Sequence, residues 1–122
     1  MNGSAATNGG GLWLEAVDHG RVRLGLLPGW DEADLIVTGV ELPSVGARLT
    51  KGQSLLHLRV TAKVCTDESC TYIPSERDFK IGCNLTVETL NQAVARDPVL
   101  LQEDPGGAGW LLEGRLDDSN QL

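Results

Sequence analysis

The chain has 122 residues, a length typical of one domain, and 41% hydrophobic and 22% charged residues are ordinary for a globular protein with its own core. The formal net charge of -7 argues against nucleic-acid and membrane surfaces as partners and favours basic protein surfaces. No apolar run reaches the roughly 18 residues of a transmembrane helix, and the start lacks the features of a signal peptide. We expect a cytoplasmic protein with protein partners, whose oligomeric state the sequence leaves open.

The N-terminal third predicts a tail followed by a hairpin. Residues 1–11 have no apolar pattern, and we expect a disordered tail, either native or an added tag. Residues 12–17 and 21–26 read as two strands around a short polar turn, since 21–26 alternates charged and apolar side chains. Residues 30–35, which begin with a tryptophan and two acids, favour one or two helical turns.

The central third predicts the longest strand of the chain. Branched residues at 35–42 indicate a strand, and a short strand is expected between Gly46 and Gly52. Residues 54–64 alternate over their full length, which places Lys63 on the more polar side of a strand. A polar turn, 66–69, follows between two cysteines.

The C-terminal third predicts more strand and little helix. Residues 79–90 contain an extended run, and 110–116 indicate a last strand. Between them we expect a short helix with Asp97 as its cap and Pro98 at its first position.

Many short strands with regular turns predict an all-β sandwich or barrel. We expect one domain over residues 12–116 and a frayed polar tail over 117–122.

Three ordered blocks resemble the glycine cleavage system H protein family, a family of lipoyl-type carriers. Each block keeps the family's spacing without gaps. The blocks are 22–43, which ends in Glu41-Leu42-Pro43, then 45–55, which begins with a Val-Gly turn, and 91–110, which contains two Asp-Pro pairs and ends in Gly-Trp. The resemblance covers residues 12–116. It implies an all-β barrel-sandwich hybrid, as in lipoyl- and biotinyl-carrier domains, with one or two short helices.

The resemblance also implies a function. Members of the family are not enzymes themselves: a lipoyl arm takes an aminomethyl group from glycine decarboxylase and passes it to the aminomethyltransferase. Dihydrolipoyl dehydrogenase then reoxidises the arm. Lys63 is the lysine of this chain that lies nearest to the family's attachment position.

The register of the chain departs from the family at that position. Ten positions after Gly52 the chain has Ala62, and Lys63 comes one residue later, without the family's preceding acid. A slip of one residue turns a side chain to the other face of a strand. The 28 positions from Lys63 to Asn91 exceed the family's length, so the hairpin is extended or remodelled. We therefore favour a protein without a cofactor over one with lipoate on Lys63.

Cys65 and Cys70 leave three interpretations open. They can form a disulfide staple, a redox pair or two plain thiols, since they lie on either side of a four-residue turn. The segment 64–74 also resembles a short Cys-containing element in the N-terminal domain of thiol-disulfide interchange proteins. Asp67 and Glu68 between the cysteines disfavour the thiolate form.

No other residues predict catalysis or metal binding. Cys83 fits a small buried residue in a strand better than a ligand, and a zinc site with His57 lacks a second matching pair. We predict no catalytic residues and no metal. Three functions remain: an H-protein-like carrier or carrier-derived protein and, as alternatives, a lipoate-free binding module of the same fold or a thiol-redox module that uses Cys65 and Cys70.

Overall fold

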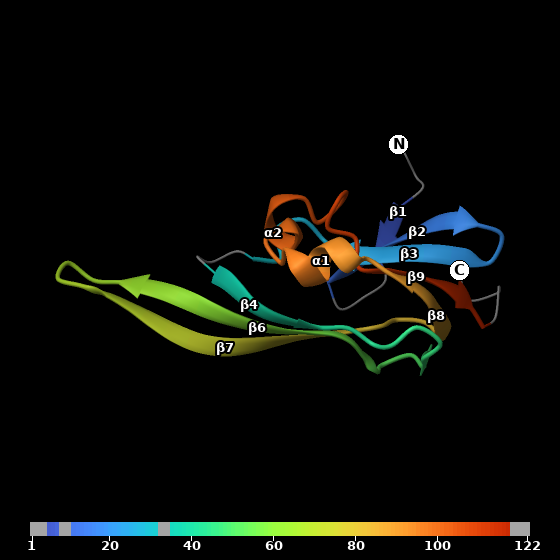
Figure 1. The fold of residues 1–122 in the computed structure, drawn as a ribbon, viewed down its shortest axis with the longest axis horizontal. Coiled ribbons are helices and arrows are strands. Elements are labelled where there is room, and N and C mark those ends of the chain that lie inside the picture. Colours follow the sequence, from blue (N-terminus) through green and yellow to red (C-terminus); the bar gives the residue numbers. More distant parts are fainter. Residues whose placement is uncertain (1–4, 8–10, 32–34, 118–122) are drawn as a thin grey trace.

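The computed structural model describes residues 5–7, 11–31 and 35–117, and two antiparallel sheets contain most of them. Six strands of the described residues form the larger sheet in the order β1-β2-β3-β9-β8-β5, and three form the smaller sheet in the order β4-β6-β7 (Figure 1). The strands are β1 (Ala5–Thr7), β2 (Leu12–Asp18), β3 (Arg21–Leu26), β4 (Leu35–Glu41), β5 (Arg48–Leu49), β6 (Ser54–Cys65), β7 (Cys70–Lys80), β8 (Leu85–Leu90) and β9 (Leu112–Leu116). The predicted all-β class is confirmed.

Alternation of side chains explains the strands of the larger sheet. In β3, Val22 and Leu24 are completely buried, whereas Arg21 and Arg23 between them are partly exposed. The two arginines lie on the other face because successive side chains of a strand point in opposite directions. Arg23 lies over the ring of Trp110 and contacts the buried Glu113, at 2.6 Å between nitrogen and carboxylate oxygen.

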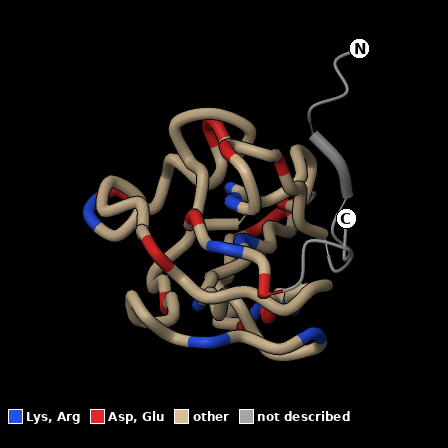
Figure 2. The backbone as a smooth tube through the Cα atoms, turned by 90° about the vertical axis from the view of Figure 1, so that its right-hand side faces the viewer, with Lys and Arg blue, Asp and Glu red and all other residues tan. Residues whose placement is uncertain are grey.

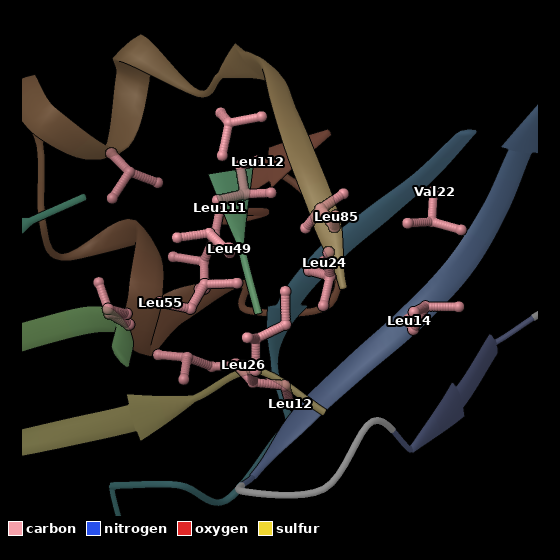
Figure 3. Close-up of a cluster of buried hydrophobic side chains, with 14 of the residues drawn as sticks. Leu12, Leu14, Val22, Leu24, Leu26, Leu49, Leu55, Leu85, Leu111 and Leu112 are labelled. Atoms are coloured by element: carbon pink, nitrogen blue, oxygen red, sulfur yellow. The ribbon is translucent and has the colours of Figure 1, made fainter. Parts of the chain in front are cut away.

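The hydrophobic core lies between the two sheets and under the helices. Figure 3 shows leucine side chains from β2, β3, β5, β8 and β9 meeting Leu55 of β6. Helix residues Val94 and Leu101 are also completely buried in this cluster. Burying one such side chain contributes about 1.5–3 kcal/mol, so this cluster is the main source of stability.

Two short helices, α1 (Gln92–Arg96) and α2 (Leu100–Glu103), follow β8. Asn91 begins α1, because its side-chain oxygen accepts a hydrogen bond from the Ala93 amide. The side-chain nitrogen of Asn91 also donates to the carbonyls of Ala108 and Trp110, at 2.9 and 2.7 Å. One buried side chain therefore starts the helix and joins it to the loop before β9.

The predicted cap at Asp97 is wrong. Asp97 ends α1 as its C-cap, with its backbone N–H donating to Ala93, and α2 begins at Leu100 after Val99. The prediction relied on the Asp-Pro pair as a helix start, but the helix that it described is divided into two. Asn91 is the capping residue that the sequence analysis missed.

Two predicted segments fall partly outside the described residues. The predicted helical turns at 30–35 include 32–34, and the predicted N-terminal tail includes 1–4 and 8–10. Within that tail, β1 pairs with β2. Trp30 is described, and its indole N–H donates to the carbonyl of Leu101 at 2.6 Å.

Candidate functional site

The β6–β7 hairpin extends beyond the body of the molecule (Figure 1). β4 pairs with β6 from His57 to Ala62, and β7 pairs with β6 along its length to Cys65 and Cys70. Among the described residues, the last three positions of β6 therefore pair with β7 alone. Every residue from Lys63 to Asp78 is exposed. The hairpin is long, with its ladder running from the pair Ser54 and Lys80 to the pair Cys65 and Cys70.

Lys63 lies on the strand and not in the turn. Its register partner is Tyr72, and it precedes Cys65 by two positions. Side chains two positions apart share a face of a strand, so the amine of Lys63 and the sulfur of Cys65 are on the same side of the hairpin. The Lys63 amine is exposed and reachable, but the backbone that carries it belongs to an antiparallel ladder.

Cys65 and Cys70 are joined in a disulfide. They form the last register pair of the hairpin, and their Cα atoms are 3.9 Å apart, closer than the separation of about 4.4–6.8 Å that is usual for bridged cysteines. Both residues are exposed. The sequence allowed paired or separate thiols at this position, and the structure pairs them.

Thr66 organises the turn that the disulfide closes. The backbone N–H of Thr66 donates to the carbonyl of Ser69 at 2.7 Å, and its hydroxyl donates to the same oxygen at 3.2 Å. The hydroxyl oxygen also accepts from the amides of Glu68 and Ser69, at 3.4 and 3.3 Å. The turn therefore has its own hydrogen bonds, independent of the sulfur bridge.

Cys83 lies far from this chemistry. It is 4% exposed within the hydrophobic core, which fits the predicted small buried residue. Across the part of the chain that the structure describes, no three His, Cys, Asp or Glu side chains are placed to hold a metal ion together. The zinc arrangement that the sequence suggested is not brought together, because Cys65 and Cys70 bond to each other.

A charged row on the outer face of the smaller sheet was missed by the sequence analysis. His57 of β6 lies between two carboxylates of β7, with its Nε2 2.5 Å from Glu76 and its Nδ1 3.7 Å from Asp78. Along the opposite edge of β6, where β4 is the neighbouring strand, Arg59 approaches Glu41 of β4 at 3.7 Å. These residues become neighbours only through strand pairing, which a single sequence does not display.

Apolar side chains also gather toward the free end of this sheet. Four exposed large apolar residues belong to the hairpin and the adjacent end of β4: Ile36, Val64, Tyr72 and Ile73, each between 46% and 55% exposed. A shallow hollow of about 480 Å³ lies at the charged row, lined in part by Arg59, Pro74 and Glu76. The outer hairpin thus offers charged, apolar and sulfur groups on one projecting element.

The body has ion pairs of its own, in which Arg21 approaches Glu88 at 3.3 Å and Glu113 at 3.5 Å. Figure 2 shows acidic and basic residues interspersed along the backbone when the molecule is viewed from the end opposite the hairpin. No helix among the described residues is long and apolar enough to cross a membrane.

Comparison with known proteins identifies relatives along almost the whole chain. The chain is 33% identical over 110 residues to the glycine cleavage system H protein of Mycobacterium avium, which is 90% of this chain and 74% of that protein. It is 27% identical to the probable mitochondrial glycine cleavage system H protein 1 of Dictyostelium discoideum, over 90% of this chain and 67% of that protein. No family model matches.

A solved structure supports the same fold. The crystal structure of a glycine cleavage system H protein from Mycobacterium marinum superposes with a TM-score of 0.69, over 96% of this chain and 87% of that chain, at 23% sequence identity. This agreement confirms the predicted barrel-sandwich fold. Given the identity and coverage of the mycobacterial relative, the chain belongs to the glycine cleavage system H protein family.

Proposed function

We propose that this chain is a carrier-derived H-protein-family member that binds partner proteins through its β6–β7 hairpin and carries no lipoate. It forms one domain over residues 12–116 and has no catalytic activity of its own. The observation that carries the proposal is the hairpin itself, which projects from a packed body and is exposed from Lys63 to Asp78.

The position of Lys63 supports the lipoate-free form. A lipoyl ligase has to surround a lysine and place its amine in an active site, which a lysine at the apex of a turn allows. Lys63 instead pairs with Tyr72 in a ladder, and the disulfide between Cys65 and Cys70 lies beyond it. The apex of this hairpin is the polar turn, whose described residues include no lysine.

The surface of the hairpin supports binding to proteins. Among the exposed apolar side chains, Tyr72 lies on the same face of β7 as the charged row of His57, Glu76 and Asp78, because positions two apart share a face of a strand. An interface typically combines apolar contact with surrounding polar pairs. The net charge of -7 favours a basic partner surface.

A second candidate function is a lipoyl carrier with lipoate on Lys63. Its support is the exposed amine on a projecting element, together with membership of the H protein family. In this form the chain would pass intermediates between the other glycine cleavage proteins.

Co-expression with a lipoyl ligase and excess lipoate separates the two candidates. Intact mass measurement of the purified protein is expected to show the unmodified chain. The matched control is Lys63→Arg, which keeps the positive charge but cannot be acylated by the ligase. A lipoyl mass on the unsubstituted chain that disappears in Lys63→Arg would establish the carrier and overturn the lipoate-free proposal.

A further inference from the structure

The exposed disulfide at the end of the hairpin has no role in the proposed docking function. Strained or exposed disulfides are typically the labile, regulatory or catalytic ones, whereas structural disulfides resist reduction. We propose that the Cys65–Cys70 disulfide is a thiol–disulfide exchange site, and that its partner is a protein dithiol with basic residues around it.

The turn does not need the disulfide as a staple. Thr66 closes it through its backbone N–H and its hydroxyl, both donating to Ser69, and it accepts two further amide hydrogen bonds. The loop between the cysteines contains only four residues, and short loops gain least from a disulfide. The hairpin can therefore keep its register when the bond opens.

The disulfide is also remote from the core. The inner side of β6 is anchored by Leu56, Leu58 and Val60, each at most 1% exposed. Beyond Ala62, every residue of the strand and the turn is exposed. Reduction of the bond therefore changes an exposed end of the hairpin and leaves the buried cluster in place.

Charge around the sulfurs selects the partner. Asp67 and Glu68 stand between the two cysteines, and both are exposed. They repel anionic thiols and attract basic surfaces. Lys63, on the same side of the hairpin as Cys65, places a cation beside the sulfur that becomes a thiolate when the bond opens.

The exchange balances as two successive displacements. We call Cys65, Cys70 and the turn between them the tip. One thiolate of the partner attacks one of the two tip sulfurs, the Sγ–Sγ bond breaks, and the other tip sulfur leaves as a thiolate. The second partner thiolate then attacks the partner's own sulfur in this mixed disulfide and releases the second tip thiolate. Two electrons pass to Cys65 and Cys70, the partner is oxidised to a disulfide, and the two protons lost by its thiols are taken up by the tip.

The first test follows the redox state of the tip in a Cys83→Ala variant, which leaves only the two tip cysteines. The protein is equilibrated with mixtures of reduced and oxidised glutathione that span the cellular range of redox potential. Free thiols are then trapped with a label, and the intact mass is measured. We expect a change from no label to two labels within the series, with the near-ultraviolet circular dichroism of the tryptophans retained. A pair that stays oxidised or stays reduced throughout would overturn the proposal, as would loss of the tryptophan signal on reduction.

The second test concerns the partner. Two synthetic peptides, each with a Cys-x-x-Cys dithiol, are flanked by arginines in one case and by glutamates in the other. We expect the arginine peptide to reduce the tip about 3–10-fold faster at low salt, with the ratio falling as salt screens the charges. Equal rates, or a faster reaction of the glutamate peptide, would overturn the proposal of a basic partner.

The control is the double variant Cys65→Ser/Cys70→Ser, whose folding is checked by circular dichroism. It must oxidise neither peptide, and oxidation by that variant would overturn the assignment of the exchange to the tip.

Discussion

β3 and β7 are both strands of antiparallel sheets, yet their surroundings are opposite. β3 buries Val22, Leu24, Gly25 and Leu26, whereas no residue of β7 is buried. The body therefore depends on apolar burial, and the outer hairpin depends on its ladder, its turn and exposed pairs. Substitutions in the body are expected to change stability, and substitutions in the outer hairpin are expected to change chemistry and binding.

The largest expected difference in stability comes from truncating an apolar side chain to alanine in each of the two regions. Leu24→Ala removes a completely buried side chain and should lower the free energy of unfolding by about 2–5 kcal/mol. Val64→Ala removes an exposed one and should change it by about 0.5 kcal/mol or less. Urea unfolding followed by tryptophan fluorescence measures both. Similar losses from the two variants would break the contrast between body and hairpin.

The next effect concerns the buried amide that starts α1. Asn91→Ala leaves the Ala108 and Trp110 carbonyls without their donor and removes the helix cap, at an expected cost of about 1–3 kcal/mol. Gln92→Ala, at the exposed next position, is the matched control and should be nearly neutral. A thermal melt of both proteins compares them, and an unaffected Asn91→Ala protein would show that α1 forms without its cap.

Ion pairs in the two regions are expected to differ by less. Glu113→Gln replaces a carboxylate that is 10% exposed and contacts Arg23 at 2.6 Å. The free energy of unfolding should fall by about 1 kcal/mol. Glu41→Gln weakens a pair with Arg59 in which both side chains are 60% exposed, and the loss should be about 0.5 kcal/mol or less. Urea titrations at low and high salt distinguish the two. A larger loss from Glu41→Gln would contradict the assignment of stability to the body.

The smallest expected effect is kinetic and lies at the tip. Asp67→Asn/Glu68→Gln removes two negative charges beside the disulfide and should speed its reduction by anionic glutathione by about two- to fivefold. The rate with a neutral small dithiol is the control and should change less. Samples quenched at successive times with a thiol label give both rates. Identical acceleration of the two reagents would show that the acids act on the cysteine thiolate that leaves and not by repelling glutathione.

The strands were predictable because their alternation is local. Residues 21–26 and 54–64 each show the period of two, and the strands begin where that period begins. The helix start was not predictable from Asp97 and Pro98, since Asn91 is selected by contacts with Ala108 and Trp110 far along the chain.

The candidate site was predictable only in part. The spacing of Cys65 and Cys70 allowed their pairing, and the length from Lys63 to Asn91 indicated an extended hairpin. The row of His57, Glu76 and Asp78 was not visible, because it requires the register of β6 against β7. A shift of that register by one residue would separate the same side chains onto two faces.

Peptide mapping of the protein purified from its native cells shows whether the hairpin lacks lipoate and has a reducible disulfide. Thiols are labelled at lysis, and trypsin is then used under non-reducing conditions. We expect cleavage after Lys63 and a peptide of residues 64–77, part of it with an internal Cys65–Cys70 disulfide and part with two labels. An uncleaved peptide of residues 60–77 with a lipoyl group on Lys63 would contradict it.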